Sequence, residues 1–419
     1  MTEIVKGFKD TEDASKRVAV RNIIEETFRL YNYIPIETPI IETEAFVKGN
    51  NSDDEAVSSI FKLQDRGKRK LALRYEFTFQ LKRLAKNKKL PYKRYQIGEV
   101  FRDEPIGPNR WRQFTQCDVD VVGVTEMTAD AEIISLTARA FKKLGFDIVI
   151  KVNNRKLLND LLLNTGVKKD KLETALLTID KLEKFGLDVV KKELKDKKID
   201  NKTIKKIIDV INIKGNNKDK INTLKKINKS EGLDEIEELF SLLNILNVNA
   251  EFDVSLARGL SYYTGTVMEV TLKNSSVKTS VCAGGRYDKM IGSFLGKGDY
   301  PAVGTSFGVD RIYDAYVEKN KVEQKTVTKV YIVPIGTFNE SLKIAEELRN
   351  ENVNVDIDLT GKGPSKNLKY ANTLGIPYVL FVGEEELKQD KVKLKDMNSG
   401  KEQLMSPGEL VLFLDKNLS

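Results

Sequence analysis

Residues 92–123 read YKRYQIGEVFRDEPIGPNRWRQFTQCDVDVVG, and this stretch decides our prediction of the fold. Tyr95 and Ile97 belong to a run of strand-forming residues, Pro105 to Arg110 is rich in turn residues, and Phe114 to Val122 alternates apolar with polar side chains. Two strand patterns separated by Pro, Gly and Asn predict a β-hairpin with a long, basic tip. We expect the rest of the chain to be organised around this hairpin.

Polar side chains line one face of the predicted hairpin. Gln116, Asp118 and Asp120 occupy alternate positions of the second strand, so their side chains point to the same side. Arg102 follows the first strand. Burial of such charges is costly unless a ligand or a partner compensates them, which predicts a binding site. The alternative is an ordinary hairpin whose polar face is exposed to solvent.

Length and composition limit the classes of protein to which the chain can belong. Its 419 residues predict two or three domains, and a hydrophobic fraction of 40% is sufficient for packed cores. We find no unbroken apolar run of the roughly 20 residues that cross a bilayer and no export signal in MTEIVKGFKD. We therefore expect a soluble, cytoplasmic protein with no membrane partner. The net charge of +8 permits a polyanionic partner without requiring one.

The chain contains no histidine and two cysteines, Cys117 and Cys282. Histidine is therefore excluded as a general base or a metal ligand, and two cysteines form neither a disulfide framework nor a usual zinc site. We predict no metal site built from His or Cys, and free buried thiols. Any catalysis must rest on arginine, lysine, carboxylates and hydrogen bonds.

Further stretches combine polar residues with glycines, prolines or strand patterns. Residues 33–46 read YIPIETPIIETEAF, and residues 73–80 read LRYEFTFQ. Residues 258–265 read RGLSYYTG, and residues 283–288 read AGGRYD. Residues 302–311 read AVGTSFGVDR, which is not a Walker loop because the Gly-Lys-Ser/Thr ending is absent.

Together these stretches resemble the class II aminoacyl-tRNA synthetases, in the form of the histidyl-tRNA synthetase family. FRDE followed by RQFTQCDVD resembles motif 2, and AVGTSFGVDR resembles motif 3. YIPIETPIIETEAF resembles motif 1, whose embedded proline, here Pro39, lies at the dimer interface of that family. RGLSYYTG and AGGRYD match two motifs that mark the histidyl enzymes. Tyr75, Phe77 and Ser261 depart from the usual pattern, which has Pro, Gly and Asp at these positions.

The resemblance also implies roles for individual residues. It places Arg102 and Arg258 at the α-phosphate of ATP, as the catalytic groups, and Arg311 at the γ-phosphate. The ATP site that it implies further includes Glu104, Arg112 and Phe114. The histidine site that it implies consists of Glu76, Thr78, Gln116, Asp120, Arg258, Tyr262, Tyr263, Gly284 and Tyr287. Asp120 and Tyr263 would bind the two imidazole nitrogens, and Mg²⁺ would accompany the phosphates of ATP.

We predict an α+β fold: a class II catalytic core, in which helices flank an antiparallel sheet, a helical insertion and a C-terminal α/β anticodon-binding domain. The boundaries that we expect are 1–156 and 251–320 for the two parts of the core, 157–250 for the insertion and 328–419 for the C-terminal domain. The insertion is rich in lysine. Its lysines either lie on ordinary solvated helix faces or contact the phosphates of an RNA helix.

The predicted function is ATP-dependent activation of L-histidine and transfer of the histidyl group to the 3′ end of tRNA(His), by a homodimer with no DNA partner. Two alternatives stay open: a non-catalytic histidine-binding regulator and a tRNA sensor. The lack of histidine in the chain also has two explanations. It allows the enzyme to be made when histidine is scarce, or it reflects compositional drift in a Lys/Ile/Asn-rich sequence.

Overall fold

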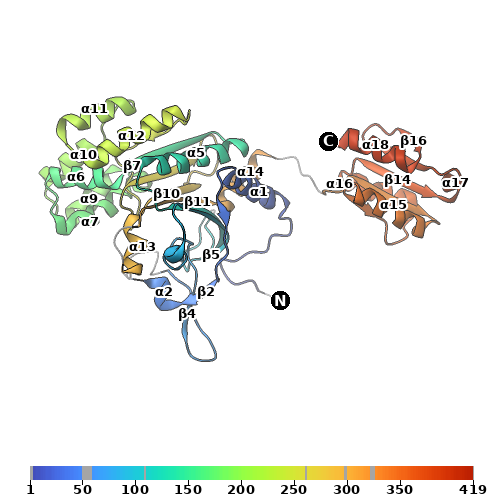
Figure 1. Ribbon diagram of the computed structural model, residues 1–419, viewed down its shortest axis with the longest axis horizontal. Coiled ribbons are helices and arrows are strands. Elements are labelled where there is room, and N and C mark those ends of the chain that lie inside the picture. The colour runs from blue at the N-terminus through green and yellow to red at the C-terminus, as the bar shows by residue number, and fades with distance from the viewer. Residues whose placement is uncertain are drawn as a thin grey trace. The chain divides into compact units, whose positions relative to one another are not determined.

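A computed structural model describes residues 3–49, 59–107, 110–259, 262–296, 300–320 and 326–418. The chain forms two compact units, Met1–Lys319 and Asn320–Ser419 (Figure 1). The predicted α+β class is confirmed, since each unit contains a sheet flanked by helices. Ser261 and part of the hairpin tip, residues 108 and 109, lie outside the described residues.

An eight-stranded sheet forms the centre of the first unit. Its strands lie in the order β1 (Ile34–Pro35), β5 (Tyr92–Phe101), β6 (Gln113–Val122), β11 (Ala302–Gly308), β10 (Cys282–Arg286), β9 (Thr266–Leu272), β7 (Ile148–Asn154) and β8 (Glu251–Phe252). The predicted hairpin is confirmed as β5 and β6, which pair antiparallel over their full length. The inner strands are all antiparallel, and only the two edge strands pair in parallel.

The two faces of this sheet differ in chemistry because side chains alternate along each strand. Cys117, Val119 and Val121 of β6 point into the main hydrophobic core. Phe307 of β11 joins them there and packs against aromatic rings of two covering helices. Those helices are α1 (Ser15–Leu30) and α5 (Met127–Lys143), and α14 (Val309–Lys319) lies beside α1 (Figure 1). The opposite face of β6 is polar.

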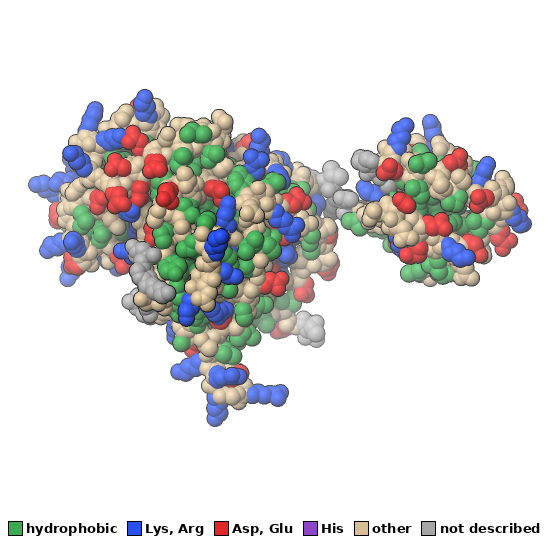
Figure 2. All heavy atoms as spheres, in the orientation of Figure 1, with side chains coloured by type: hydrophobic (Ala, Val, Ile, Leu, Met, Phe, Trp, Pro, Cys, Tyr) green, Lys and Arg blue, Asp and Glu red, His purple; other side chains and the backbone are tan. Residues whose placement is uncertain are grey.

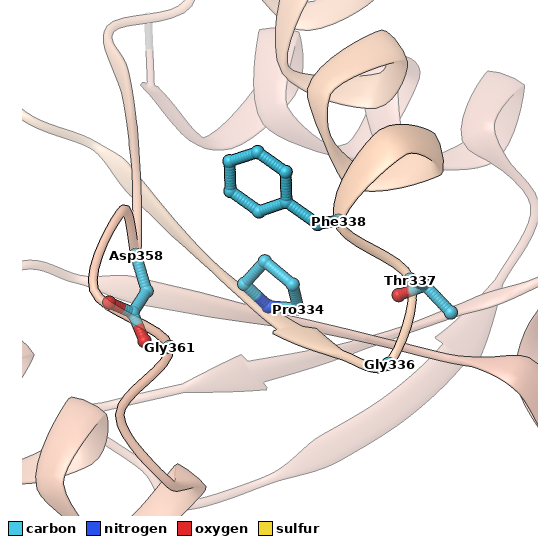
Figure 3. A pocket seen from close by; sticks show the side chains of 6 residues that line it. All are labelled: Pro334, Gly336, Thr337, Phe338, Asp358 and Gly361. Carbon is cyan, nitrogen blue, oxygen red and sulfur yellow. The ribbon is translucent and has the colours of Figure 1, made fainter.

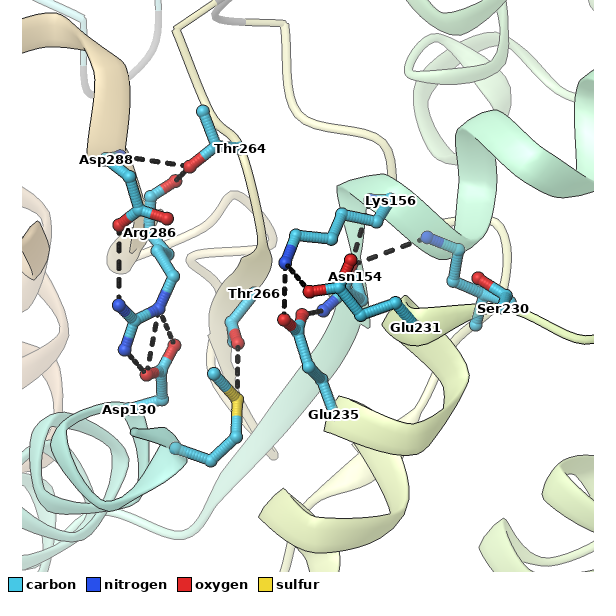
Figure 4. Close-up of polar contacts among 12 residues, drawn as sticks. Asp130, Asn154, Lys156, Ser230, Glu231, Glu235, Thr264, Thr266, Arg286 and Asp288 are labelled. Atoms are coloured by element: carbon cyan, nitrogen blue, oxygen red, sulfur yellow. Dashed lines mark hydrogen bonds and ion pairs between the residues drawn. The ribbon is translucent and has the colours of Figure 1, made fainter. Parts of the chain in front are cut away.

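A buried ion pair fastens α5 to the sheet. Arg286, the arginine of AGGRYD, is 2% exposed and donates hydrogen bonds to the carboxylate of Asp130, whose side chain is fully buried (Figure 4). Arg286 also donates to the carbonyl oxygens of Val124 and Glu126. Its donors are thus largely satisfied on the core side of the sheet, which assigns Arg286 a structural role.

A small three-stranded sheet packs beside the main one. It has the order β2 (Ile41–Thr43), β4 (Lys70–Leu73) and β3 (Lys62–Gln64). The helices near it are α2 (Glu44–Lys48), α4 (Leu81–Leu84), the 3-10 turn Ala85–Asn87 and α13 (Asp288–Leu295). Residues 74–80 follow β4 and are buried, which brings the LRYEFTFQ stretch against the main sheet.

Helices follow β7 without an intervening strand, as predicted. They are α6 (Arg155–Thr165), the 3-10 turn Lys169–Lys171, α7 (Leu172–Ile179), α8 (Leu182–Phe185), α9 (Leu187–Asp196), α10 (Asn201–Ile211), α11 (Asn217–Ile227) and α12 (Glu231–Ile245) (Figure 1). A separate hydrophobic cluster contains buried apolar residues of α6, α7, α9 and α10. The apolar residues of α11 and α12 instead join the core of the main sheet.

The second unit contains a five-stranded sheet. Its order is β13 (Val355–Ile357), β12 (Val330–Ile335), β14 (Tyr378–Gly383), β15 (Val392–Asp396) and β16 (Glu402–Met405). The first three strands are parallel, as the alternation of strand and helix predicts. The hairpin β15–β16 is antiparallel. The helices are α15 (Phe338–Asn350), α16 (Pro364–Leu374), α17 (Glu384–Leu387) and α18 (Pro407–Leu418). No helix among the described residues of either unit is long and apolar enough to span a membrane.

The buried pair gives a prediction about stability. Replacing Arg286 with Met leaves the Asp130 carboxylate buried without its cation, and we expect the free energy of unfolding to fall by about 3–5 kcal/mol. Urea unfolding followed by fluorescence reports on the first unit alone, since Trp111 is the single tryptophan. The control is Arg69→Met, which removes an exposed ion pair with Asp65 and should change stability by at most about 0.5 kcal/mol. Equal effects of the two substitutions would refute the structural role of Arg286.

Candidate active site

The strand register places polar residues in rows across the face of the main sheet opposite the core. In one row Gln96, Asp118, Ser306, Ala283 and Glu269 lie side by side on five strands. In the next row lie Arg94, Asp120, Gly304, Gly285 and Val267. Gln116 lies in a third row, between Gly98 and Gly308. We call this surface the polar face. It confirms that Gln116, Asp118 and Asp120 point together.

One end of the polar face holds two buried carboxylates and one buried cation. Arg94 is 0% exposed, and its guanidinium lies 2.7 Å from a carboxylate oxygen of Asp120. Burial raises the pKa of Asp120, and Arg94 opposes this shift. Burial raises the pKa of Asp118 to about 7, with Arg94 again opposing and Asp120 adding to the rise. Two acids thus share one guanidinium, a costly arrangement in a protein interior.

The second oxygen of Asp120 also has a partner. It accepts a hydrogen bond from the hydroxyl of Tyr287, which is buried. A side chain at Gly304 would overlap this carboxylate, because a Cβ there would lie 2.0 Å from its oxygen. Asp120 therefore lies against bare backbone and is held by Arg94 on one side and Tyr287 on the other.

The predicted tyrosines and Glu76 form one wall above these acids. Tyr262 packs against Tyr263 and Tyr287, with ring centroids 4.8 and 5.9 Å apart. The hydroxyl of Tyr262 donates to the carboxylate of Glu76 over 3.5 Å. Glu76 and Thr78 are buried, 6% and 8% exposed. The structure thus brings Glu76 together with Tyr262, although Tyr75 and Phe77 depart from the family pattern around it.

Two glycines of AGGRYD face opposite ways. Gly284 lies in register with Met268 and Thr305, so its α-carbon points toward the core face and not toward the polar face. Gly285 lies on the polar face, where a Cβ would lie 2.9 Å from the ring of Tyr263. Gly285 therefore contacts the tyrosine wall, and the histidine-binding role of Gly284 stays a prediction. Only the backbone of Gly284 remains for a ligand.

The other end of the polar face gathers arginines. Burial lowers the pKa of Arg311, and the nearby positive charges of Arg102, Arg110 and Arg258 lower it further. We call these four residues the arginine cluster. Arg311 donates to the carbonyl oxygen of Ser280 over 2.7 Å, and Arg102 donates to that of Tyr75 over 3.2 Å while lying 5.2 Å from the ring centre of Phe114. Four neighbouring guanidinium groups, three of which lower the pKa of Arg311, favour a polyanionic ligand.

Arg258 occupies a strained position beside this cluster. Its backbone φ is 59°, in the left-handed region that non-glycine residues rarely adopt. Its guanidinium lies 3.1 Å from Glu269, and its Nε atom is buried without a hydrogen-bond partner among the described residues. Strain together with an unsatisfied buried donor is typical of residues that contact a ligand.

Three further predicted residues lie at the hairpin tip or beside the small sheet. Glu104 accepts hydrogen bonds from Arg110, and Arg112 donates to the backbone carbonyl of Glu104 and pairs with Asp103 over 3.1 Å. Both are thereby tied to the hairpin tip. Pro39 is exposed and lies next to β2, an edge strand of the small sheet.

Sequence analysis missed several residues of the polar face. Arg94 and Ser306 were not singled out, and Asp118 was noted only for its direction. Arg110 and Glu269, which belong to the arginine end, were also missed. The alternation of β5 would have placed Arg94 on the same face as Gln96, because the two residues are two positions apart.

The second unit has a pocket of its own. It has a volume of about 330 Å³ and is lined by Pro334, Gly336, Thr337, Phe338, Asp358 and Gly361 (Figure 3). Phe338, which lines this pocket, is 43% exposed. The carboxylate of Asp358 accepts hydrogen bonds from Thr360, Lys362 and Asn367, which lower its pKa to about 2 although burial opposes them. These bonds hold the loop that carries Gly361, Lys362 and Gly363.

Comparison with known proteins decides the family. The model of the family described as histidyl-tRNA synthetase matches residues 7–312, and that of the anticodon binding domain matches residues 329–417. The chain belongs to the histidyl-tRNA synthetase family. It is 39% identical to histidine–tRNA ligase 1 of Bacillus cereus over 95% of this chain and 94% of that protein, and 35% identical to histidine–tRNA ligase of Clostridium tetani over 98% and 97%.

Solved structures agree with this membership of the histidyl-tRNA synthetase family. The crystal structure of histidyl-tRNA synthetase from Nostoc sp. PCC 7120 matches with a TM-score of 0.87 and 28% identity, covering 99% of both chains. A structure titled ATP phosphoribosyltransferase regulatory subunit/histidyl-tRNA synthetase, from Bacillus halodurans, matches with a TM-score of 0.76 at 20% identity, covering 91% of this chain and 98% of that one. The second likeness shows the fold alone.

The arginine cluster gives a prediction about anion binding. We expect inorganic pyrophosphate to bind to the protein, and Arg311→Met to weaken this binding by about tenfold or more, because a charge-assisted hydrogen bond is lost. Arg311→Lys should recover part of the loss, since a single ammonium replaces a forked donor. Calorimetric titration measures both dissociation constants. Arg69→Met, which alters a distant exposed arginine, is the control, and an unchanged constant for Arg311→Met would contradict a role in anion binding.

Proposed function

We propose that this chain is a histidine–tRNA ligase. It activates L-histidine with ATP to give histidyl-adenylate and pyrophosphate, and then transfers the histidyl group to the 3′ end of tRNA(His). The observation that supports this most is the division of the polar face, which has buried carboxylates at one end and clustered guanidinium groups at the other. An amino acid with a cationic ammonium group and a nucleotide with an anionic triphosphate require these two chemistries side by side.

In the proposed reaction the carboxylate of histidine attacks the α-phosphate of ATP. No protein base is needed, because the nucleophile is already ionised. Arg102 and Arg258 would stabilise the negative charge that develops on the oxygens of the α-phosphate, and Arg311 would bind the γ-phosphate. The unpartnered Nε atom of Arg258 is a donor that such an oxygen would satisfy. Phe114, under the guanidinium of Arg102, would offer an aromatic face to the adenine.

Mg²⁺ fits this proposal as a companion of ATP. The carboxylates next to the arginine cluster, Glu104 and Glu269, are already paired with Arg110 and Arg258. The chain therefore offers few free oxygen ligands there, and Mg²⁺ would be held mainly by phosphate oxygens, as is usual for this ion in nucleotide sites. Its chemistry is to neutralise charge on the pyrophosphate that leaves.

The carboxylate end would select the amino acid. Glu76, Thr78 and Gln116 would surround the ammonium group, and Asp120 and Tyr263 would bind the two imidazole nitrogens. Tyr287 donates to Asp120 and would fix its carboxylate in place. A site that depends on buried hydrogen bonds rejects analogues that lack the matching group by about 10⁴-fold. The remaining predicted contacts, Tyr262 and the backbone of Gly284, line this space.

Two parts of the chain would meet tRNA. The pocket beside Phe338 would accept an unstacked base of the anticodon, stacked on the exposed aromatic ring (Figure 3). The lysines of residues 157–250 are the second candidate. Some of them pair with acids, as Lys181 does with Glu193 and Lys225 with Glu237, and Figure 2 shows both charges interspersed on that part of the surface. Both interpretations of these lysines, solvated helix faces and contacts with RNA phosphates, therefore stay predictions.

We also propose a cytoplasmic homodimer. Around Pro39 the large apolar side chains of Ile34, Ile40 and Ile41 are 47%, 45% and 51% exposed. They lie on or beside β1 and β2, each of which is the edge strand of its sheet. A second copy of the chain would cover these residues, as the resemblance of this segment to motif 1 implies. The domain boundaries 1–156, 157–250, 251–320 and 328–419 are kept as part of the proposal.

The non-catalytic alternatives, a histidine-binding regulator or a tRNA sensor, are not favoured. The arginine cluster, which only phosphate chemistry requires, is in place, and so is the C-terminal unit. Relatives at 39% and 35% identity are named as ligases.

The test of the proposed function is exchange of labelled pyrophosphate into ATP by the purified protein without tRNA. We expect exchange with L-histidine and background with other amino acids. Arg258→Ala should lower the rate by about 10²-fold or more, because a donor to the developing charge is lost. Arg69→Met is again the matched control and should retain full exchange. Binding of histidine without any exchange would instead identify a regulator or sensor.

A further inference from the structure

Gln116, Ser306 and Asp118 form a hydrogen-bonded chain across β6 and β11. The side-chain amide nitrogen of Gln116 donates to the hydroxyl oxygen of Ser306 over 2.9 Å, and that hydroxyl donates to a carboxylate oxygen of Asp118. The strand register places Ser306 directly opposite Asp118, with Gln116 two positions along β6. The proposed mechanism uses Gln116 at the ammonium group of histidine and does not involve Ser306 or Asp118.

The direction of this chain follows from its last member. An ionised carboxylate only accepts hydrogen bonds, so the hydroxyl proton of Ser306 must point to Asp118. The oxygen of Ser306 is then left as an acceptor, and it must receive its bond from the NH₂ group of Gln116. The amide oxygen of Gln116 consequently points away from Ser306. An asparagine at position 118 would remove this constraint, because its side chain both donates and accepts.

The amide oxygen of Gln116 is unsatisfied as a result. It is buried and accepts no hydrogen bond from the part of the chain that the structure describes. A buried acceptor without a partner is costly and needs an explanation, such as a ligand that supplies the missing donor. Gln116 lies between Gly98 and Gly308 on the polar face and is only partly buried, so part of its side chain is accessible to a ligand.

We propose that Asp118 is a positioning residue which acts through Ser306 to orient the amide of Gln116, so that its oxygen accepts a hydrogen bond from the ammonium group of the amino-acid substrate. This inference rests on the proposed function, since it assumes that the polar face binds histidine. It assigns Asp118 no contact with the substrate. Asp118 affects specificity by making the amide oxygen of Gln116 the acceptor that faces the substrate, which favours a ligand with a cationic amine over a ligand without one.

The charges around Asp118 allow it to remain ionised. Burial raises the pKa of Asp118 to about 7, and Asp120 and Glu76 contribute to the rise. Arg94, on the neighbouring strand β5, and the hydrogen bond from Ser306 oppose it. Other titratable or charged groups that interact with Asp118 are Arg74, Cys117, Tyr263, Cys282 and Tyr287. Because the carboxyl is charged only above this pKa, the orienting effect should be complete near pH 8 and should be lost as the pH falls toward 6.

The test compares two ligands by calorimetry at pH 8: L-histidine and imidazolepropionate, which lacks the ammonium group. For Asp118→Asn we expect the dissociation constant of L-histidine to rise about tenfold or more, the usual effect of losing a charge-assisted hydrogen bond. That of imidazolepropionate should stay near the wild-type value. Ser306→Ala should give the same pattern. In pyrophosphate exchange KM for histidine should rise while kcat is largely kept, because the arginine cluster is unchanged.

A double substitution provides the rescue. Gln116→Glu supplies an acceptor that needs no orientation, so combining it with Asp118→Asn should restore the preference for L-histidine. Between pH 8 and 6 that preference should fall in the wild type and stay flat in Asp118→Asn, and the titration of the ligand itself is common to both proteins. Equal weakening of both ligands, or failure of the rescue, would overturn the proposal. If the wild-type protein binds histidine but catalyses no exchange, the proposed function is refuted. The calorimetric comparison of the two ligands still tests the role of Asp118 in that case.

Discussion

The ion pair between Arg94 and Asp120 is the interaction on which the polar face depends. Both side chains are almost completely buried, and Asp118 adds a second acid in the adjacent row. Without the guanidinium, two carboxylates in a protein interior would have to take up protons or unfold the site. Such a pair contributes little net stability, since its desolvation cost offsets its attraction. In the proposed function, its value is that it keeps acidic hydrogen-bond acceptors buried, where a cationic substrate would be bound strongly.

The position of this pair follows from the register of the sheet. Arg94 and Asp120 are direct partners across β5 and β6, and Ser306 is the direct partner of Asp118 on β11. A shift of one residue in either pairing would turn the acids toward the hydrophobic core and expose Cys117 and Val119. The core face and the polar face thus specify the same alignment. The glycines of β10 and β11 complete it, because a side chain at Gly304 or Gly285 would fill the space against Asp120 or Tyr263.

Much of this arrangement was predictable from the sequence. The hairpin, its polar face and the order of motifs required only strand alternation, turn residues and resemblance to a family. Arg94 and Ser306 were not predictable in the same way, because the role of each depends on its contact with a residue of a neighbouring strand. The motif also could not show which face of the sheet Gly284 and Gly285 occupy, because only their pairing with β9 and β11 decides this. The clustering of Arg110 with Arg311 depends on how the hairpin tip folds over the sheet.

We propose that the amino acid binds at the carboxylate end of the polar face and the triphosphate of ATP at the arginine end. A crystal structure with ATP and L-histidinol tests it most directly, because histidinol keeps the ammonium and imidazole groups but has no carboxylate to react. We expect its ammonium group within hydrogen-bond distance of Glu76 and Gln116 and its imidazole beside Asp120. The phosphates should contact Arg102, Arg258 and Arg311. Phosphates bound away from these arginines, or an imidazole bound away from Asp120, would contradict the claim.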